Sequence, residues 1–301
     1  MGRREMQADR PCATPKRPWR RVRTAALPVA LVLSVVCAVA IGPTRAQEPF
    51  RVYPSFEGAS AEAPLPADYE VPGELVIGRL MYPPARGGFF GGGGWRNGNA
   101  SWTDDYPRGD RTLVGMLRRF TRINVRAVEQ PINLEVDGDV NYWPFMVVGL
   151  ASPWDLTDEM AATLREYLLR GGFLFCDSFF DSRDWAVFQQ NLKKVFPDRP
   201  IINLTDDHPI FNIVFDLPNM TSVQIPNWNS LIRGGGGYIG DGAVPYWRGV
   251  EDDEGRLMML IAFNNDVMDG WQWADDPRYP SEEANLSLQL GVNVVMYAMT
   301  H

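Results

Sequence analysis

The chain has 301 residues, of which 45% are hydrophobic, so it is long enough to bury the core of one large domain or of two smaller ones. Its charge is uneven: residues 1–46 hold nine Arg and Lys against two Asp and Glu, whereas the rest holds 20 basic and 35 acidic residues, a formal net charge of −15. An acidic domain lacks the basic patches that bind phosphate, which argues against nucleic acid and against an anionic membrane surface as partners.

The first 46 residues have the composition of an export leader. Basic residues precede the uncharged apolar run 25–42, and Thr44-Arg45-Ala46 supplies the small residues expected before a cleavage site. Cleavage there would start the mature chain at Gln47, whereas an uncleaved run of 18 residues is long enough to serve as an anchor. In both cases we expect an exported protein of the periplasm or cell envelope, which would contact the membrane only if residues 25–42 remain as an anchor.

Residues 47–73 are rich in Pro, Ala, Ser and Glu and show little periodicity. We therefore predict an extended linker here, followed by one domain at 74–301. The domain begins with the apolar run 75–82, which predicts a buried strand. Asp110 could cap a helix whose apolar residues share one face.

Apolar runs and amphipathic stretches then alternate along the chain. This alternation predicts an α/β fold with a mostly parallel sheet and helices on both faces. A C-terminal hairpin follows, and the last helix is apolar on most sides, which predicts that it is packed. The predicted elements are strands at 124–128, 145–150 and 173–176, helices at 157–170 and 185–196, a hairpin at 246–251 and 256–263, and a terminal helix at 281–299.

Cys176 and Asp177 stand where a predicted strand ends and a helix follows. In an open α/β sheet, ligands bind beyond the carboxyl ends of the strands, so both residues are candidates for a site. A nucleophilic cysteine on such a turn needs flanking glycines, but Leu174 and Ser178 occupy those positions, and we predict that Cys176 is a structural thiol. Asp177 needs no special turn and is the better candidate acid or base.

His208 is the only histidine apart from the terminal His301. Within Asp206-Asp207-His208-Pro209 it could act as a base or bind a metal ion. A turn capped by Asp, with the ring packed against it, explains the same residues and is the interpretation we favour. As a catalytic candidate, His208 would have to meet Asp177 in the fold.

Residues 264–280 combine carboxylates, amides and tryptophans in one irregular stretch, which is costly to order unless it has a role. We expect its polar side chains to bond backbone groups and its tryptophans, Trp271 and Trp273, to anchor it, with sugar-stacking platforms as the alternative. The stretch is expected to fold over the strand ends and form one wall of a cleft.

The same stretch offers oxygen ligands suited to calcium. Their spacing fits no calcium-binding loop pattern, so we assign no metal and no cofactor and keep calcium as the alternative. Its ligands would be Asn265, Asp266, Asp269, Asp275 and Asp276.

Arg79 interrupts the first apolar run. A buried guanidinium without a partner is costly, so we expect an acidic partner, either Asp177 or a carboxylate of residues 264–276. The glycine runs 91–94 and 234–237 are not followed by Lys and Ser or Thr, and they do not predict a phosphate loop.

Long, ordered motifs run through the chain from residue 102 onward. They are Trp102-Thr103-Asp104-Asp105-Tyr106-Pro107 with Asp110-Arg111, Arg118-Arg119-Phe120-Thr121-Arg122-Ile123, Tyr142-Trp143-Pro144-Phe145, Leu168-Leu169-Arg170-Gly171-Gly172-Phe173-Leu174, Asp207-His208-Pro209-Ile210-Phe211, the run 264–280, and Asn293-Val294-Val295-Met296-Tyr297-Ala298-Met299-Thr300-His301. On these motifs, residues 74–301 resemble a family known only as domain of unknown function 4159. The resemblance implies a bacterial, exported protein with a class I glutamine amidotransferase-like fold, a flavodoxin-like three-layer α/β sandwich.

True amidotransferases of that superfamily use a cysteine within Gly-x-Cys-x-Gly and a His-x-Glu pair. In this chain Cys176 lacks the glycines, and Pro209-Ile210 follows His208, so the resemblance does not carry amidotransferase chemistry over. The family supplies no other catalytic residues for comparison.

We therefore expect a non-catalytic binding or assembly module of the cell envelope, whose partner is an unidentified envelope ligand or protein. The alternative is a hydrolase acting on an envelope carbohydrate or peptide, with Asp177 as acid or base and His208 as its partner. The candidate ligand-binding residues are Arg79, Asp177, Asn265, Asp266, Asp269, Trp271 and Trp273.

Overall fold

A seven-stranded mixed sheet forms the centre of the domain in the computed structural model, which describes residues 50–85, 94–136 and 139–301. The strand order is β2-β1-β3-β4-β7-β6-β5. The first five strands in this order run parallel, and β6 is antiparallel to both β7 and β5. The strands are β1 (Gly78–Met81), β2 (Gln130–Asn133), β3 (Phe145–Val148), β4 (Phe173–Phe179), β5 (Ile202–Asn203), β6 (Tyr246–Glu251) and β7 (Leu257–Phe263).

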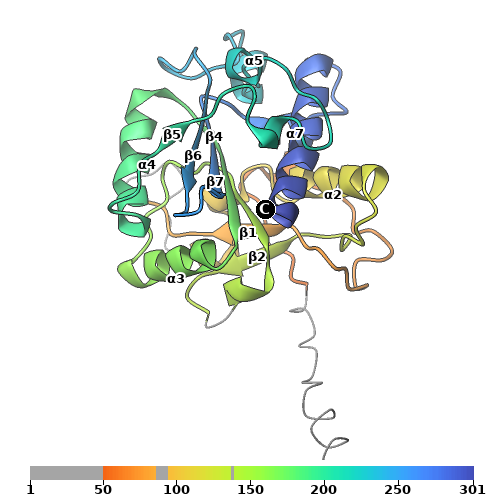
Figure 1. Cartoon of the computed structure of the whole chain (residues 1–301). Helices are drawn as coiled ribbons and strands as arrows, with labels where there is room; N and C mark the ends of the chain where they lie inside the picture. Colours follow the sequence, from red (N-terminus) through yellow and green to blue (C-terminus); the bar gives the residue numbers. More distant parts are fainter. Residues whose placement is uncertain (1–49, 86–93, 137–138) are drawn as a thin grey trace, which may run out of the picture. The chain divides into compact units, whose positions relative to one another are not determined.

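Helices cover both faces of this sheet, as Figure 1 shows. On one face α2 (Arg108–Phe120), α6 (Val267–Gln272) and α7 (Ser281–Thr300) pack against one another, and on the other α3 (Asp158–Leu169) and α4 (Asp181–Val195) do so. The domain is thus a three-layer α/β sandwich, which confirms the predicted fold class together with its hairpin and packed terminal helix. The remaining elements are α5 (Trp228–Ile232) and short 3-10 turns at Gly58–Ala61, Trp95–Asn97, Ser101–Thr103, Asp139–Tyr142, Pro209–Phe211 and Met220–Ser222.

The central strands are apolar on both sides because both of their faces are covered. Along β4, Leu174 and Cys176 enter the core beneath α3 and α4, whereas Phe173 and Phe175 enter the core beneath α2, α6 and α7. Continuous apolar runs of this kind are typical of parallel strands covered by helices. The prediction of central strands from such runs is therefore confirmed at β3 and β4.

Two local predictions were wrong. Residues 124–128 do not form the predicted strand; they contribute a single bridge, between Leu75 and Val125. The strand that follows them in the sequence is β2, which contains Pro131. Proline cannot donate a ladder hydrogen bond, and β2 accordingly lies at the edge of the sheet. Asp110 does not cap α2, which begins at Arg108 after Pro107, so Asp110 lies in the first turn of the helix.

Residues 47–73 were expected to be an extended linker, but the described residues from Phe50 onward belong to the same compact unit as the rest of the domain. We call residues 50–66 the covering segment, because they pack onto the domain. Ser55 Oγ donates a hydrogen bond to the Thr103 carbonyl at 2.8 Å, the Glu57 carboxylate accepts one from the Asp105 amide at 2.7 Å, and Ala61 is fully buried. A few polar anchors hold this segment, and such anchors leave no periodic signal in a sequence.

The predicted leader at residues 1–46, with its apolar run 25–42, lies outside the described residues. Among the helices within the described ranges, none combines the length and the apolar character that crossing a membrane requires.

Candidate functional site

Carboxylates gather at the carboxyl edge of the parallel strands. Asp177 lies near the end of β4, as predicted, and β4 is the central strand of the sheet. After β7, Asn264 turns the chain with a left-handed φ of 61°, and Asp266 then caps α6 by accepting a hydrogen bond from the Asp269 amide. Asp105 reaches the same place from the loop before α2.

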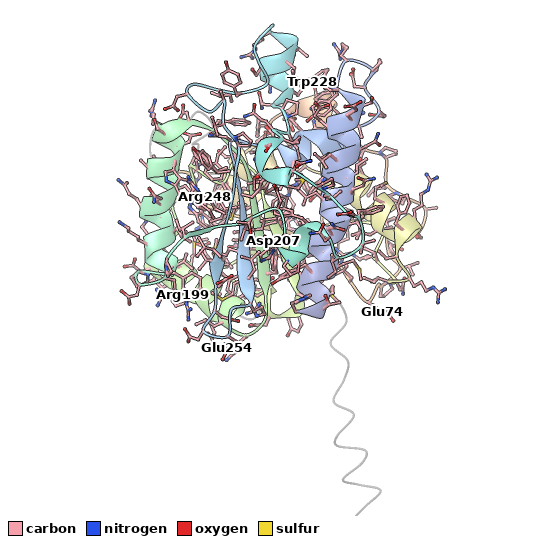
Figure 2. The ribbon with its side chains drawn as sticks, turned by 45° about the horizontal axis from the view of Figure 1, so that its top comes forward. Glu74, Arg199, Asp207, Trp228, Arg248 and Glu254 are labelled. Atoms are coloured by element: carbon pink, nitrogen blue, oxygen red, sulfur yellow. The ribbon has the colours of Figure 1, made fainter. Side chains whose placement is uncertain are left out.

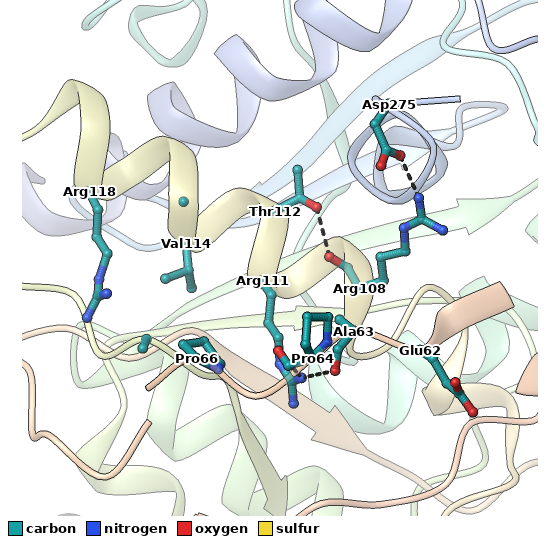
Figure 3. Close-up of a pocket in the computed structure, with 12 residues that line it drawn as sticks. Glu62, Ala63, Pro64, Pro66, Arg108, Arg111, Thr112, Val114, Arg118 and Asp275 are labelled. Atoms are coloured by element: carbon teal, nitrogen blue, oxygen red, sulfur yellow. Dashed lines mark hydrogen bonds and ion pairs between the residues drawn. The ribbon is translucent and has the colours of Figure 1, made fainter. Parts of the chain in front are cut away.

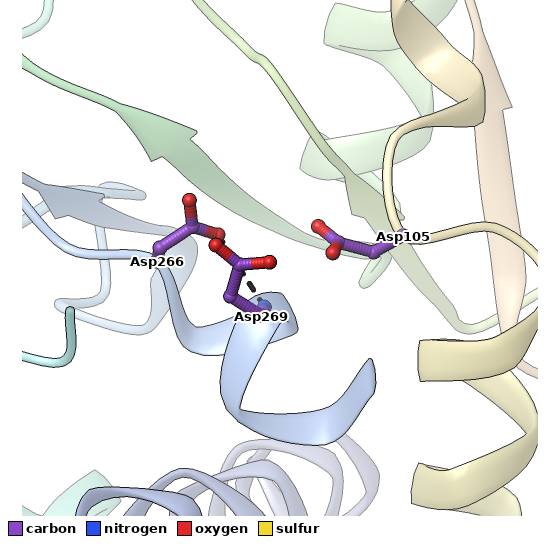
Figure 4. A group of neighbouring side chains, drawn as sticks. All are labelled: Asp105, Asp266 and Asp269. Atoms are coloured by element: carbon purple, nitrogen blue, oxygen red, sulfur yellow. Dashed lines mark hydrogen bonds between the residues drawn. The ribbon is translucent and has the colours of Figure 1, made fainter. Parts of the chain in front are cut away.

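Three of these carboxylates face one another, as Figure 4 shows. Asp105, Asp266 and Asp269 each offer an oxygen within 4.8 Å of the others. The hydroxyl of Ser178 joins the group to Asp177: Ser178 Oγ lies 2.9 Å from Asp266 Oδ1, 3.4 Å from Asp177 Oδ2 and 3.5 Å from Asp105 Oδ2. We call Asp105, Asp177, Asp266 and Asp269 the carboxylate cluster.

The carboxylate cluster is closed to solvent, since its side chains belong to residues that are at most 5% exposed. Burial raises the pKa values of Asp105, Asp177 and Asp269 well above the usual range of a carboxyl group. Repulsion by Asp266 raises the pKa values of Asp177 and Asp269 further, and repulsion by Asp104 does the same for Asp105. Buried like charges of this kind are found at functional sites more often than elsewhere.

Part of the cluster is held by neutral donors. The Met268 amide donates to Asp177 Oδ2 at 2.7 Å, and the Trp228 amide donates to Asp269 Oδ2 at 2.6 Å. By contrast, Asp177 Oδ1 has no hydrogen-bond partner among the described residues, although it is buried. Buried oxygens are normally paired, so this one requires an explanation.

Arg79 is fully buried and has an acidic partner, as expected, but the expected identity of that partner was wrong. The guanidinium bonds to Asp110 through Nη2 to Oδ2 at 2.8 Å and through Nε to Oδ1 at 3.2 Å. Neither Asp177 nor the 264–276 stretch supplies its ion pair. The reason is the first turn of α2, which brings Asp110 to the side chain of Arg79 on β1.

His208 lies near the amino ends of the parallel strands, at the opposite end of the sheet from Asp177. It caps a 3-10 turn, its Nδ1 accepts a hydrogen bond from the Ile210 amide at 3.2 Å, and burial lowers the pKa of its ring. The His208 ring is 5.7 Å from that of Tyr297, whose hydroxyl accepts from the amide of Leu257 at the start of β7. His208 and Asp177 therefore do not converge.

Figure 2 labels residues that lie at the two ends of the sheet's strands. Trp228, whose amide bonds to Asp269, lies at the end that holds the cluster, and Glu254, in the turn of the hairpin, lies at the opposite end. Ligands of open parallel sheets bind at the carboxyl edge, so the structure leaves the cluster edge as the candidate site and His208 outside it.

The stretch 264–280 folds over the strand ends and is ordered in the expected way, although it contains the short helix α6. Asn265 Oδ1 accepts a hydrogen bond from the Ile225 amide at 2.9 Å, so its side chain serves the loop. Trp271 is fully buried, with Nε1 donating to the Ser287 carbonyl at 2.8 Å, and Trp273 stacks on Trp228 at a ring distance of 4.4 Å. Both tryptophans are anchors, and neither presents a free face for a sugar.

The ligands of the calcium alternative separate in the structure. Asp266 and Asp269 belong to the carboxylate cluster, whereas Asp275 pairs with Arg108 and Asp276 with Arg278 on the surface. Asp105 was missed in the sequence analysis, although it lies within one of the motifs that carry the family resemblance. The available signal was the acidic pair Asp104-Asp105, which lies just before a predicted helix. Asp105 is far from Asp266 in the sequence, so this pair alone gave no sign that the two side chains meet.

Cys176 lies in the core and is fully buried. Burial, and then the neighbouring Asp177, raise the pKa of its thiol well above the usual range, so the thiolate is disfavoured. We expect iodoacetamide to leave Cys176 unmodified in the native protein and to modify it after denaturation, as read by peptide mass mapping. Stoichiometric modification of the native chain at Cys176 would contradict its assignment as a structural thiol.

On the surface, a groove of about 500 Å³ opens between α2 and the covering segment. Arg108, Arg111 and Arg118 line it from α2, and Pro64 and Pro66 line it from the covering segment, as Figure 3 shows. Glu62 and Asp275 also line the groove, so its basic side chains outnumber its acidic ones, although the domain as a whole is acidic.

Comparison with known proteins places the chain in a family. The family described as Domain of unknown function (DUF4159) matches residues 94–299, which cover the loop before α2, the whole sheet from β2 onward and nearly all of α7. Among curated proteins, none matches the chain. The chain is a member of the DUF4159 family.

Proposed function

We propose that the chain is an exported, non-catalytic binding or assembly module of the cell envelope. One observation carries the non-catalytic part: Asp177 is fully buried at one edge of the sheet, and His208 lies at the other. An acid and a base must reach the same substrate to act together, and these two cannot. Export rests on the composition of residues 1–46.

The groove beside α2 is the surface that we assign to the partner. Arg108 pairs with Asp275, whose side chain is 77% exposed, and Arg118 pairs with Asp68, whose side chain is 46% exposed. Exposed ion pairs contribute little to stability, so a ligand carboxylate can replace either partner at small cost. Arg111 is different, because its partner Glu129 is fully buried and holds it in place.

The expected ligand follows from this chemistry. Two exchangeable guanidinium groups lie on one helix, about one turn before and about two turns after a fixed third, and they suit the carboxylates of an extended acidic protein segment. The prolines on the opposite wall leave few backbone donors there and favour a side-chain-mediated contact. The partner is therefore an acidic segment of an envelope protein.

A hydrolase remains the alternative, and one observation favours it. Carboxyl groups with raised pKa values cluster at the carboxyl edge of the sheet, where α/β enzymes hold their substrates. For such chemistry the covering segment would have to lift from the cluster, since Glu57 accepts a hydrogen bond from the Asp105 amide.

A photo-crosslinking amino acid at Thr112, which lines the groove, tests the proposal in cells. We expect a discrete adduct with one protein in the envelope fraction, and we expect Arg108→Glu with Arg118→Glu to reduce it at least tenfold by removing the charges that attract the ligand. The same amino acid at Glu166, exposed on α3, is the matched control and should give no such adduct.

The two functions differ in their response to Asp177→Asn, because the hydrolase would use this carboxylate as its acid or base. A binding module keeps its adduct and its phenotype in complemented cells, because Asp177 does not line the groove. Loss of the phenotype with an Asp177→Asn protein that still folds, together with full activity of the Arg108→Glu and Arg118→Glu variant, would favour the hydrolase.

A further inference from the structure

The carboxylate cluster carries more negative charge than its neighbours neutralise. Asp105, Asp177, Asp266 and Asp269 are all buried, and the donors that reach them are backbone amides and neutral side chains. Arg79 forms its ion pair with Asp110, and among the described residues its hydrogen bonds go to Asp110, the Asp104 carbonyl and Met268, not to these four carboxylates. Buried charge without a counter-charge is costly, so the cluster must take up protons or a cation.

Two groups in the cluster have acceptor capacity to spare. Within the described residues, the Asp105 carboxylate has one hydrogen bond, the 3.5 Å contact with Ser178 Oγ, and that hydroxyl is closer to Asp266. Asp177 Oδ1 has none, and the other oxygen of the same carboxylate contacts Ser178 Oγ at 3.4 Å. Both carboxylates are buried and under-satisfied, and the Asp105 carboxylate faces those of Asp266 and Asp269, which is the position expected of a missing ligand.

The spacing of the oxygens suits a shared metal ion. Two oxygens bound to one Ca²⁺ at about 2.3–2.6 Å lie at most about 5 Å apart. The facing oxygens of Asp105, Asp266 and Asp269 lie within 4.8 Å of one another. The donor set consists of oxygen alone, without histidine or cysteine, which selects hard cations over zinc.

We propose that Asp105, Asp266 and Asp269 bind a hard divalent cation of the Ca²⁺ or Mg²⁺ type, with Asp177 as the fourth acidic group beside it. The ion ties together the loop before α2 and the start of α6, which are distant in the sequence. It would also fix the position of α2, whose arginines line the groove.

Thermal unfolding of the full chain tests this binding. Protein stripped with a chelator is expected to gain roughly 5–10 °C in Tm at about a hundredfold excess of the right cation over its Kd, because the ion binds the native state. Separate titrations with Ca²⁺, Mg²⁺ and Mn²⁺ identify the cation, and the chelator should reverse the gain. Tb³⁺ should show luminescence sensitised by Trp273, whose Nε1 lies 2.9 Å from Asp269 Oδ1.

Asp105→Asn is the informative variant, since the Asp105 carboxylate contributes one long hydrogen bond to the fold. In chelator we expect this variant to be at least as stable as the wild type, because a repelling charge is gone. With the cation it should lose the gain in Tm and at least tenfold in affinity. Asp275→Asn is the control: it removes an exposed carboxylate that follows α6, and this variant should keep the full gain in Tm.

The proposal is overturned if no cation raises the Tm of the wild type and equilibrium dialysis finds well under one ion per chain, which would assign neutralisation to protons. It is also overturned if Asp105→Asn folds and keeps the gain. Should Asp105→Asn fail to fold, dialysis and Tb³⁺ luminescence of the wild type decide the matter. Neither outcome depends on the groove, so the proposed function is tested separately.

Discussion

Replacing Arg79 by Met is expected to lower the free energy of unfolding by about 3–5 kcal/mol, because the change leaves a buried carboxylate without its partner. Both side chains of the Arg79–Asp110 pair are 0% exposed. Arg79 Nη1 also donates to the Asp104 carbonyl at 3.2 Å, and this bond would be lost as well. Urea unfolding followed by far-UV circular dichroism measures the change.

The double variant Arg79→Met with Asp110→Leu shows whether the loss comes from the unpaired charge. Removing both partners takes away the buried charge, so we expect much of the stability to return. Arg170→Met is the matched control, since Arg170 and Glu166 form an exposed pair and should contribute less than about 1 kcal/mol. A double variant as unstable as the sum of its single variants would contradict this explanation.

Replacing Trp271 by Ala is expected to cost about 3–5 kcal/mol of stability, the range for a large aromatic side chain removed from a core. The ring lies 5.9 Å from that of Phe175, and its Nε1 donates to the Ser287 carbonyl. Gly291 makes room for it, because a Cβ there would lie 3.0 Å from Trp271 Cζ2. Urea unfolding again provides the measurement.

Trp271→Phe separates packing from hydrogen bonding. It keeps most of the ring and loses the indole donor, so we expect a loss of about 1–2 kcal/mol. Tyr238→Ala removes an aromatic ring that is 39% exposed and serves as the control, with a change within about 0.5 kcal/mol. If Trp271→Ala left stability unchanged and weakened binding of a ligand, the residue would be a binding platform and not an anchor.

The cation site and the groove are linked through one element. Asp105 lies directly before α2, and Arg108 and Arg111 lie in its first turns. A cation at Asp105 would therefore order the end of the helix that presents these arginines. In that arrangement the cluster would stabilise the proposed binding surface, in keeping with the proposed binding module.

The sequence by itself determined the layers and the position of Asp177 near the end of a central strand. Continuous apolar runs specify β3, β4 and β7, because strands buried on both faces are built mainly from apolar residues. The alternation of such runs with amphipathic helices specifies a parallel sheet, and the topology of that sheet then places Asp177 at its carboxyl edge. The polar anchoring of the 264–280 stretch also followed from its composition.

Only the tertiary structure decided which side chains meet. Arg79 needs an acid, yet several acids could reach it, and the packing of α2 on β1 selects Asp110. Asp105 joins Asp266 and Asp269 because two loops converge at the same sheet edge, and no periodicity records that distance. The covering segment is held by a few polar contacts between residues far apart in the chain, so its composition alone resembles that of a linker.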